Sequence, residues 1–326
     1  MNLAGISSLN SANSRYFVPK RHHACAFTLF ELLVVILILA VLALTLLPAL
    51  AREHAGSQTT LCFSNFRQLA SAWLMYADDN QGTLPGNHWQ DEQNWLTYSN
   101  ENWVSGWEGV DGTGGNGLRP TQGGPDNTNT TLLVNPMYST LGEYTKSPSL
   151  YRCPSSIVLA PVSLTFSPRY PLCRTVSMNC WIGYNTDPDG SQSISGSPLF
   201  NYSACPDQVF TKTTAITGGI NPSTLFVFIE ERAESIDDGW FEAIPNSGNT
   251  IYNWPGNYHN NGTCSVSFAD GHVESHIWHN LATSVSQEFF LASQVAIINE
   301  KWGQANVSGA QSADLTWLSS HATCSK

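Results

Sequence analysis

The residues best suited to hold a metal ion form an alternating pattern in the C-terminal part of the chain. His272, Glu274 and His276 occupy alternate positions, and alternate side chains of a β-strand point to the same face. Two imidazoles and a carboxylate are ligands that divalent metals accept. Because the sequence offers no evident fourth ligand, the interpretation we favour is the half-exposed polar face of a hairpin.

A second acidic pattern resembles the opening of a calcium-binding loop. Asn185, Asp187 and Asp189 precede Gly190, and oxygen ligands at alternate positions suit Ca²⁺. The twelfth position of this frame is Gly196, where a calcium loop places a bidentate Glu. A turn therefore explains Asp187 and Asp189 better than a calcium site. The sequence also has no G-x-S-x-G nucleophile elbow, so we predict no enzymatic activity. We predict no cofactor, with calcium or another divalent metal as the open alternative.

An acidic residue also interrupts the most apolar segment of the chain. Residues 27–48 (FTLFELLVVILILAVLALTLLP) contain a single charge, Glu31. A helix of this length, at about 1.5 Å per residue, matches the roughly 30 Å hydrocarbon core of a bilayer. A charge inside a membrane helix is costly, so Glu31 needs a partner.

The charges around this segment indicate its orientation. Arg15, Lys20 and Arg21 precede it, and no Lys or Arg lies within it. The positive-inside rule therefore places the N-terminus in the cytoplasm and the residues after about 50 outside. An ordinary secretory signal has the same order of charge and apolar residues, but its apolar run is shorter and has no use for an internal acid.

Residues 26–35, AFTLFELLVV, resemble the processing motif of type IV pilins and type II secretion pseudopilins. The resemblance implies that a membrane prepilin peptidase cuts between Ala26 and Phe27 and methylates the new amine of Phe27. Where the family usually has Gly before the cut, this chain has Ala26, which is still small. Glu31 then gains a partner, because its carboxylate can pair with the terminal ammonium of a neighbouring subunit and set the register of an assembly.

Short motifs further along the chain resemble the prepilin-type proteins of the H-X9-DG class. The class is named for a His that precedes an Asp-Gly hairpin, and His259 with Asp270 and Gly271 fill these positions, separated by ten residues instead of nine. We expect a hydrogen bond between His259 and Asp270 across the hairpin base. The other matching motifs are Cys62-x-x-Asn65-x-Arg67-Gln68-Leu69, Tyr76-Ala77-Asp78-Asp79-Asn80-x-Gly82, Tyr151-Arg152-Cys153-Pro154-Ser155, Ser177-Met178-Asn179, Phe228-Ile229-Glu230-Glu231-Arg232 and Asp237-Asp238-Gly239.

The hairpin lies within residues 259–278. A two-residue type I′ turn at Asp270 and Gly271 would pair Ala269 with His272. The predicted faces follow from this register. One face carries Cys264, Val266, Phe268, Val273 and Ile277, and the other carries Ser265, Ser267, His272, Glu274, His276 and Trp278.

The chain is predicted to fold as α+β, with a long N-terminal transmembrane helix packed on an antiparallel β-sheet, as in pilins, and with long loops. An apolar stripe with helical spacing extends the helix beyond the membrane; it consists of Cys62, Phe66, Leu69, Trp73 and Tyr76. The expected parts are a leader (1–26), the transmembrane helix (27–48), its continuation (49–82) and an extracytoplasmic β-rich domain (83–326).

Composition restricts the partners and the redox chemistry. The 326 residues carry a net charge of -11, which repels a polyphosphate, so nucleic acid is excluded as a partner. The eight cysteines include no CxxC pair, which removes support for a zinc ribbon or a thioredoxin-like site. Seven remain if Cys25 leaves with the leader, and an odd number allows disulfides plus one free or intermolecular thiol, with connectivity open.

Two main functional hypotheses follow, beside a third, a metal-dependent enzyme, that is supported only by His272, Glu274 and His276. The first is a pseudopilin-like structural subunit of a type II secretion or pilus-like system, with prepilin peptidase, other pseudopilin or secretion-system subunits and the inner membrane as partners. The second is a membrane-tethered surface module that binds a glycan or protein through loops carrying Trp89, Trp95, Trp103 and Trp107, and uses the leader for export only. Both place a single-pass protein in the cytoplasmic membrane with its C-terminal domain in the periplasm or at the cell surface.

Overall fold

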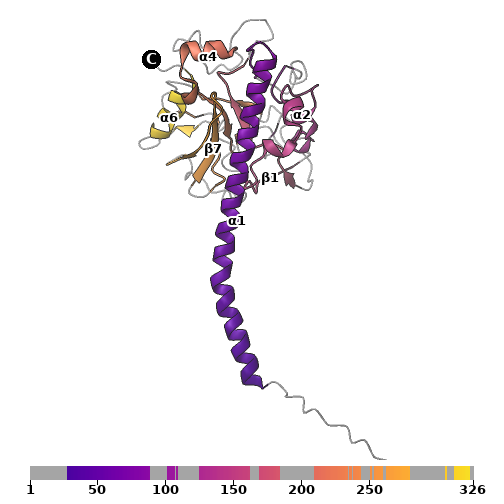
Figure 1. Cartoon of the computed structure of the whole chain (residues 1–326), viewed down its shortest axis with the longest axis vertical. Coiled ribbons are helices and arrows are strands. Elements are labelled where there is room, and N and C mark those ends of the chain that lie inside the picture. The colour runs from indigo at the N-terminus through magenta and orange to yellow at the C-terminus, as the bar shows by residue number, and fades with distance from the viewer. Residues whose placement is uncertain are drawn as a thin grey trace, which may run out of the picture. The chain divides into compact units, whose positions relative to one another are not determined.

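The computed structural model divides into two compact units, residues 1–51 and 52–326, shown in Figure 1. For residues 46–55 only the backbone is described. The described residues are 28–88, 101–106, 108, 125–161, 169–183, 209–233, 235–236, 238–243, 250–251, 253–259, 262–279, 305–306 and 312–323.

Helix α1 (Leu29–Asp79) is the longest element and runs without interruption through Pro48. In the first unit its large apolar side chains from Leu29 to Leu44 are exposed. No helix within the described residues is both long enough and apolar enough to cross a membrane. The anchor at residues 27–48 therefore stays a prediction.

The last part of α1 belongs to the second unit and is buried along one face. Cys62, Phe66, Leu69 and Trp73 are each at most 1% exposed, and they pack in one apolar cluster with strand residues of the sheet. Tyr76 is only partly buried against this cluster. Four apolar side chains at helical spacing therefore dock α1 on the sheet of this unit.

The central sheet has five strands in the order β5-β3-β4-β7-β8. Its pairs are antiparallel except for β3 and β5, which are parallel. The predicted α+β class is confirmed, but the expectation of a purely antiparallel sheet is wrong at this edge. Because the chain crosses from β4 over β3 to reach β5, β5 pairs with β3 and not with β4, so the two strands that are adjacent in sequence do not form a hairpin. The strands are β3 (Val176–Asn179), β4 (Phe226–Glu230), β5 (Trp240–Phe241), β7 (Thr263–Phe268) and β8 (Val273–Ile277).

Shorter elements surround this sheet. Two small antiparallel sheets pair β1 (Leu159–Pro161) with β2 (Arg169–Pro171) and β6 (Thr250–Ile251) with β9 (Ala305–Asn306). The other helices within the described residues are η1 (Pro125–Thr128), α2 (Thr131–Val134), α3 (Gly142–Thr145), η2 (Pro148–Tyr151), α4 (Thr213–Gly219), η4 (Pro222–Thr224) and α6 (Ser312–Ala322).

The sheet separates two apolar clusters. The cluster that contains α1 takes Val227 and Phe228 from β4, whereas the cluster that contains α6 takes Phe226 and Ile229. Strict alternation would send neighbouring residues to opposite faces, and the register shift between Phe226 and Phe228 breaks that alternation. This irregularity in β4 turns Glu230, its last residue, towards the α1 side, where it contacts Cys62.

The hairpin exists, but its predicted register is wrong by one residue. Cys264 pairs with His276 and Val266 with Glu274, so His272, Glu274 and His276 share a face with Cys264, Val266 and Phe268. The loop has three residues rather than two, because Phe268 N–H donates to the His272 carbonyl. Only Gly271 in this loop has positive φ, at +89°. A type I turn followed by a left-handed Gly has this geometry, whereas type I′ needs positive φ at both central residues.

Candidate functional site

The N-terminus of α1 is closed by a reciprocal pair of hydrogen bonds. Thr28 N–H and Thr28 Oγ1 each donate to Glu31 Oε2 at 2.9 Å, and Glu31 N–H donates to Thr28 Oγ1 at 3.2 Å. This is a capping box, in which residues three apart satisfy backbone donors that the first helical turn leaves open. The sequence analysis missed this role of Glu31, although Thr28 and Glu31 carry the required Thr-x-x-Glu spacing.

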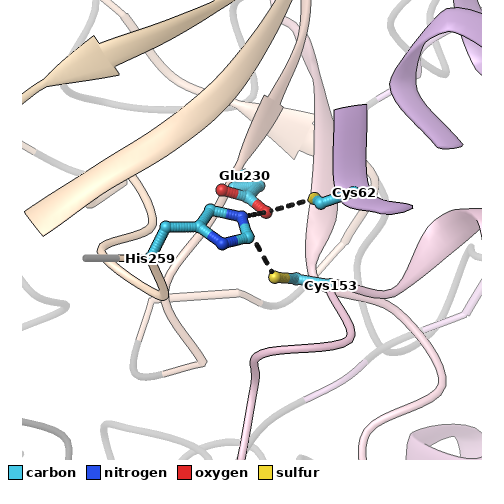
Figure 2. A group of neighbouring side chains, drawn as sticks. All are labelled: Cys62, Cys153, Glu230 and His259. Carbon is cyan, nitrogen blue, oxygen red and sulfur yellow. Dashed lines mark hydrogen bonds and ion pairs between the residues drawn. The ribbon is translucent and has the colours of Figure 1, made fainter. Parts of the chain in front are cut away.

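A second constellation lies buried in the unit of residues 52–326. Figure 2 shows the side chains of Cys62, Cys153, Glu230 and His259 pointing towards one another. Cys62 comes from α1, Cys153 follows η2, Glu230 ends β4, and His259 lies in the turn before β7. Their exposed fractions are 1%, 0%, 0% and 7%. The fold therefore brings four polar side chains from distant segments into one buried cluster.

The distances within the cluster are those of hydrogen bonds. Cys62 Sγ donates to Glu230 Oε1 at 2.7 Å, and His259 Nε2 lies 3.1 Å from the same oxygen. Cys153 Sγ is 3.5 Å from His259 Nε2. The carboxylate of Glu230 thus sits between a thiol and an imidazole.

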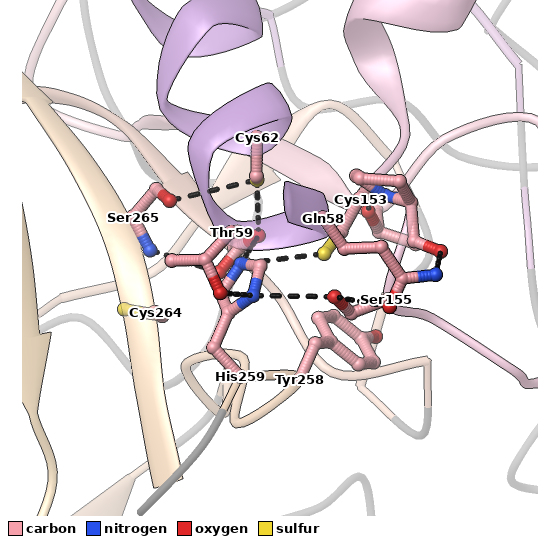
Figure 3. Close-up of polar contacts among 12 residues, drawn as sticks. Gln58, Thr59, Cys62, Cys153, Ser155, Tyr258, His259, Cys264 and Ser265 are labelled. Atoms are coloured by element: carbon pink, nitrogen blue, oxygen red, sulfur yellow. Dashed lines mark hydrogen bonds and ion pairs between the residues drawn. The ribbon is translucent and has the colours of Figure 1, made fainter. Parts of the chain in front are cut away.

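Further groups hold these side chains in place (Figure 3). His259 Nδ1 lies 3.2 Å from Thr59 Oγ1 and 3.3 Å from Ser155 Oγ. On the other side, Ser265 N–H donates to Glu230 Oε2 at 2.8 Å and Ser265 Oγ is 3.5 Å from Cys62 Sγ. Both nitrogens of His259 and both oxygens of Glu230 are therefore engaged.

Burial and the neighbouring polar groups shift the pKa of His259 in opposite directions. Burial lowers its pKa, but the hydrogen bonds to Cys153 and Glu230, together with the charge of Glu230, outweigh burial and raise the pKa of His259 to about 10. Burial, the hydrogen bond with Cys153 and the charge of Glu230 raise the pKa of Cys62 well above its usual value. The directions of the two pKa shifts favour a protonated His259 beside Glu230 and a neutral thiol at Cys62.

Among the described residues, these four are the one group of His, Cys, Asp and Glu whose ligand atoms are close enough to share a metal ion. The alternating triad of His272, Glu274 and His276, for which the sequence favoured a polar hairpin face over a metal site, is not brought together in that way. His272 Nδ1 pairs with Asp270 Oδ1 at 2.5 Å, and its ring stacks on Phe268. His276 stacks on Trp317 of α6, with ring centroids 3.9 Å apart, and burial lowers its pKa to about 4. Both histidines are thus engaged in aromatic contacts, His272 with Phe268 of β7 and His276 with Trp317 of α6.

The hydrogen bond predicted between His259 and Asp270 is wrong. His259 N–H donates to the Thr263 carbonyl at 3.3 Å, which places His259 beside the start of β7. Asp270 follows the end of that strand. The two residues of the H-X-DG pattern therefore stand at opposite ends of β7, and His259 turns to Glu230 instead.

Several predicted residues remain to be placed. Ala26, Phe27, Asp187 and Asp189 lie outside the described residues. Trp103, expected in an aromatic binding surface, is fully buried, and its indole N–H donates to the Gly239 carbonyl at 3.0 Å. The other three tryptophans of that proposed surface also lie outside the described residues.

The sequence analysis did not recognise Cys62, Cys153 and Glu230 as partners of His259. Each lies in one of the short motifs that resemble the H-X9-DG class, and each is of a residue type that can bind a metal. The presence of such a residue in several of these motifs was the available signal. The distances between these residues along the sequence predict no contact, because only the fold brings them together.

Comparison with known proteins identifies the N-terminal segment. A family model described as the prokaryotic N-terminal methylation motif matches residues 21–47. A search of curated proteins gives no match, and a search of solved structures gives none. The H-X9-DG resemblance lies outside the matched residues and stays a prediction. The matched segment supports a prepilin-type protein that is cleaved and methylated near its N-terminus.

Proposed function

We propose that the chain is a pseudopilin-like structural subunit of a type II secretion or pilus-like system. Prepilin peptidase cuts it before Phe27, and residues 27–48 anchor it in the cytoplasmic membrane with the N-terminus inside and residues 83–326 outside. The observation that carries this proposal is the methylation motif at residues 21–47. Its partners are prepilin peptidase, neighbouring pseudopilin or secretion-system subunits and the inner membrane.

The first unit supports an apolar environment for this segment. The large apolar side chains between Leu29 and Leu44, in the first part of α1, are largely exposed, and an apolar surface of this kind needs a lipid or protein partner. Glu31 is exposed among them and is satisfied locally by Thr28. In the proposed assembly its carboxylate exchanges that local contact for the ammonium of a neighbouring Phe27. The role is structural rather than catalytic.

The binding-module hypothesis gains nothing from the described residues. Its aromatic surface included Trp103, which packs on Tyr151 and Phe228 in the core at ring-centroid distances of 6.0 and 5.0 Å. A buried indole cannot bind a glycan at the surface. We therefore favour the structural subunit.

Processing is tested by mass spectrometry of the protein co-expressed with a prepilin peptidase. We expect the mature N-terminus at Phe27, with an added methyl group. Ala26→Gly should speed cleavage, because the family resemblance places Gly there, and the bulky variant Ala26→Leu should block it. An intact Met1 in the presence of active peptidase, or a cut beyond Ala49, would overturn the proposal.

Assembly is tested with two variants that separate the two roles of Glu31. Glu31→Gln keeps a capping residue, since Gln also completes a capping box, but removes the charge. Thr28→Ala removes the cap and keeps the charge. We expect Glu31→Gln to be processed yet absent from cross-linked assemblies, and Thr28→Ala to assemble. The reverse pattern would show that Glu31 serves only to cap the helix.

A further inference from the structure

Four side chains with the chemistry of zinc ligands converge in the core of residues 52–326 (Figure 2). Two sulfurs, one imidazole nitrogen and one carboxylate oxygen are all ligand types that Zn²⁺ accepts, and four protein ligands are the number that a structural zinc site uses. These donor atoms all lie within 4.8 Å of one another. From this geometry we propose that Cys62, Cys153, Glu230 and His259 bind one Zn²⁺ ion in a closed structural site. The inference does not depend on how the N-terminus is processed.

The distances between donors are close to the edges of a zinc tetrahedron. Zn–S bonds of about 2.3 Å and Zn–N or Zn–O bonds of about 2.0–2.2 Å give ligand-to-ligand edges of roughly 3.3–3.8 Å. The 3.5 Å from Cys153 Sγ to His259 Nε2 already fits. Glu230 Oε1 lies 2.7 Å from Cys62 Sγ and 3.1 Å from His259 Nε2. A withdrawal of this carboxylate by less than about 1 Å is enough to admit the ion.

The surroundings of the four ligands also fit a metal site. His ligands of zinc usually engage their second ring nitrogen in a hydrogen bond that fixes the tautomer. Here Thr59 and Ser155 take that place at His259 Nδ1 (Figure 3). The backbone N–H of Ser265 donates to Glu230 Oε2 and so orients the carboxylate, while Glu230 Oε1 faces Cys62 and His259.

The donor set selects zinc among common divalent ions. Ca²⁺ takes six to eight oxygen ligands and Mg²⁺ six in an octahedron, whereas this cluster supplies a carboxylate oxygen with two sulfurs and a nitrogen. Thiolate with imidazole in a four-ligand set is typical of zinc. All four positions are filled by buried protein side chains, so no position is open to a substrate and the ion acts by cross-linking α1, β4 and two connecting segments.

Two rival states of the same residues bind no metal. One is a disulfide between Cys62 and Cys153, and the other is the hydrogen-bonded cluster with a charged His259. The test uses the full-length protein, reduced and purified in detergent, incubated with Zn²⁺ and dialysed. We expect one zinc per chain by elemental analysis, and a thermal midpoint that falls by several degrees when a strong chelator is added.

Variants identify the ligands. Cys153→Ser and His259→Ala should each reduce the zinc content from one ion per chain to none. Cys180→Ser is the matched control, since Cys180 is an equally buried cysteine in the other apolar cluster, and it should retain the ion. A measurement on the wild-type chain keeps the test decisive if a variant does not fold. With Co²⁺ in place of Zn²⁺, the wild-type chain should show the absorption of tetrahedral, thiolate-bound Co²⁺.

The proposal is overturned by any of three results. These are a reduced wild-type chain that binds no zinc or cobalt, zinc retained in full by Cys153→Ser, and a Cys62–Cys153 disulfide in protein recovered from its native membrane. None of these results would alter the expected cleavage before Phe27, so failure of the metal site and failure of the proposed function are distinguishable.

Discussion

Glu31 and Glu230 are carboxylates in two apolar regions of the chain, and they are satisfied in different ways. Glu31 is exposed, and its hydrogen-bond partner Thr28 lies three residues away. Glu230 is fully buried and contacts His259 and Cys62, which are 29 and 168 residues away. One carboxylate depends on its sequence neighbours and the other on the complete fold.

This difference explains what each residue does for the protein. Glu31 can give up its contact with Thr28 without disturbing the core, which suits a residue expected to exchange partners during assembly. Glu230 cannot, because its buried neighbours would lose the carboxylate that accepts their hydrogen bonds, and removing one partner of a buried polar or charged pair is strongly destabilising. The contact of Glu31 can be replaced, whereas the contacts of Glu230 are required for the fold. Variants at the two residues test this difference.

The largest expected effect is at Glu230. Glu230→Ala leaves His259, Cys62 and the backbone N–H of Ser265 without their shared acceptor, and breaking a buried ion pair costs about 3–5 kcal/mol. Urea unfolding of the full-length protein in detergent, followed by tryptophan fluorescence, should show this loss with a chelator present. The contacts of Glu230 with Cys62, His259 and Ser265 are present without metal, so this prediction does not require the zinc site.

Glu31→Ala provides the comparison for this measurement. It removes an exposed carboxylate from the first turn of α1 and should leave the unfolding midpoint of residues 52–326 unchanged. If Glu230→Ala unfolds as wild type does, or if Glu31→Ala shifts the midpoint equally, the contrast between the two carboxylates is wrong.

The fold could be predicted from sequence where the signal is local. The helical stripe from Cys62 to Trp73 and the hairpin around Gly271 each depend on neighbouring residues, and both are present. The predicted register of the hairpin was wrong because Asp-Gly suits both a two-residue and a three-residue loop. One additional loop residue moves every side chain of β8 to the other face of the sheet. The parallel position of β5 depends on a long connection that has no local pattern.

The candidate site shows the same limit more sharply. Spacing drew attention to His272, just before β8, and His276, within it. It missed Cys153 and Glu230, which lie in separate segments. Ligands on one strand are visible as a motif, but here they stack on Phe268 and Trp317 instead. Residues on four segments become a cluster only after the sheet has formed and α1 has docked on it.

A substitution in the hairpin loop tests a feature that depends on neighbouring residues. Its expected effect on stability is smaller than that of Glu230→Ala. Gly271 has φ of +89°, which a β-branched residue avoids. A Cβ at this position would also lie 3.1 Å from Leu74 Cδ1 of α1. Gly271→Val should therefore lower the free energy of unfolding by about 1–3 kcal/mol in the same urea assay.

Gly271→Asn separates backbone strain from crowding. Asn tolerates positive φ better than other residues with a side chain, but its Cβ meets Leu74 as closely as that of Val. If backbone strain dominates, Gly271→Asn should lose clearly less stability than Gly271→Val. Equal losses that Leu74→Ala relieves in both would assign the effect to the contact with α1. No loss in either variant would contradict the three-residue loop, because a loop without positive φ at residue 271 has no need of Gly there.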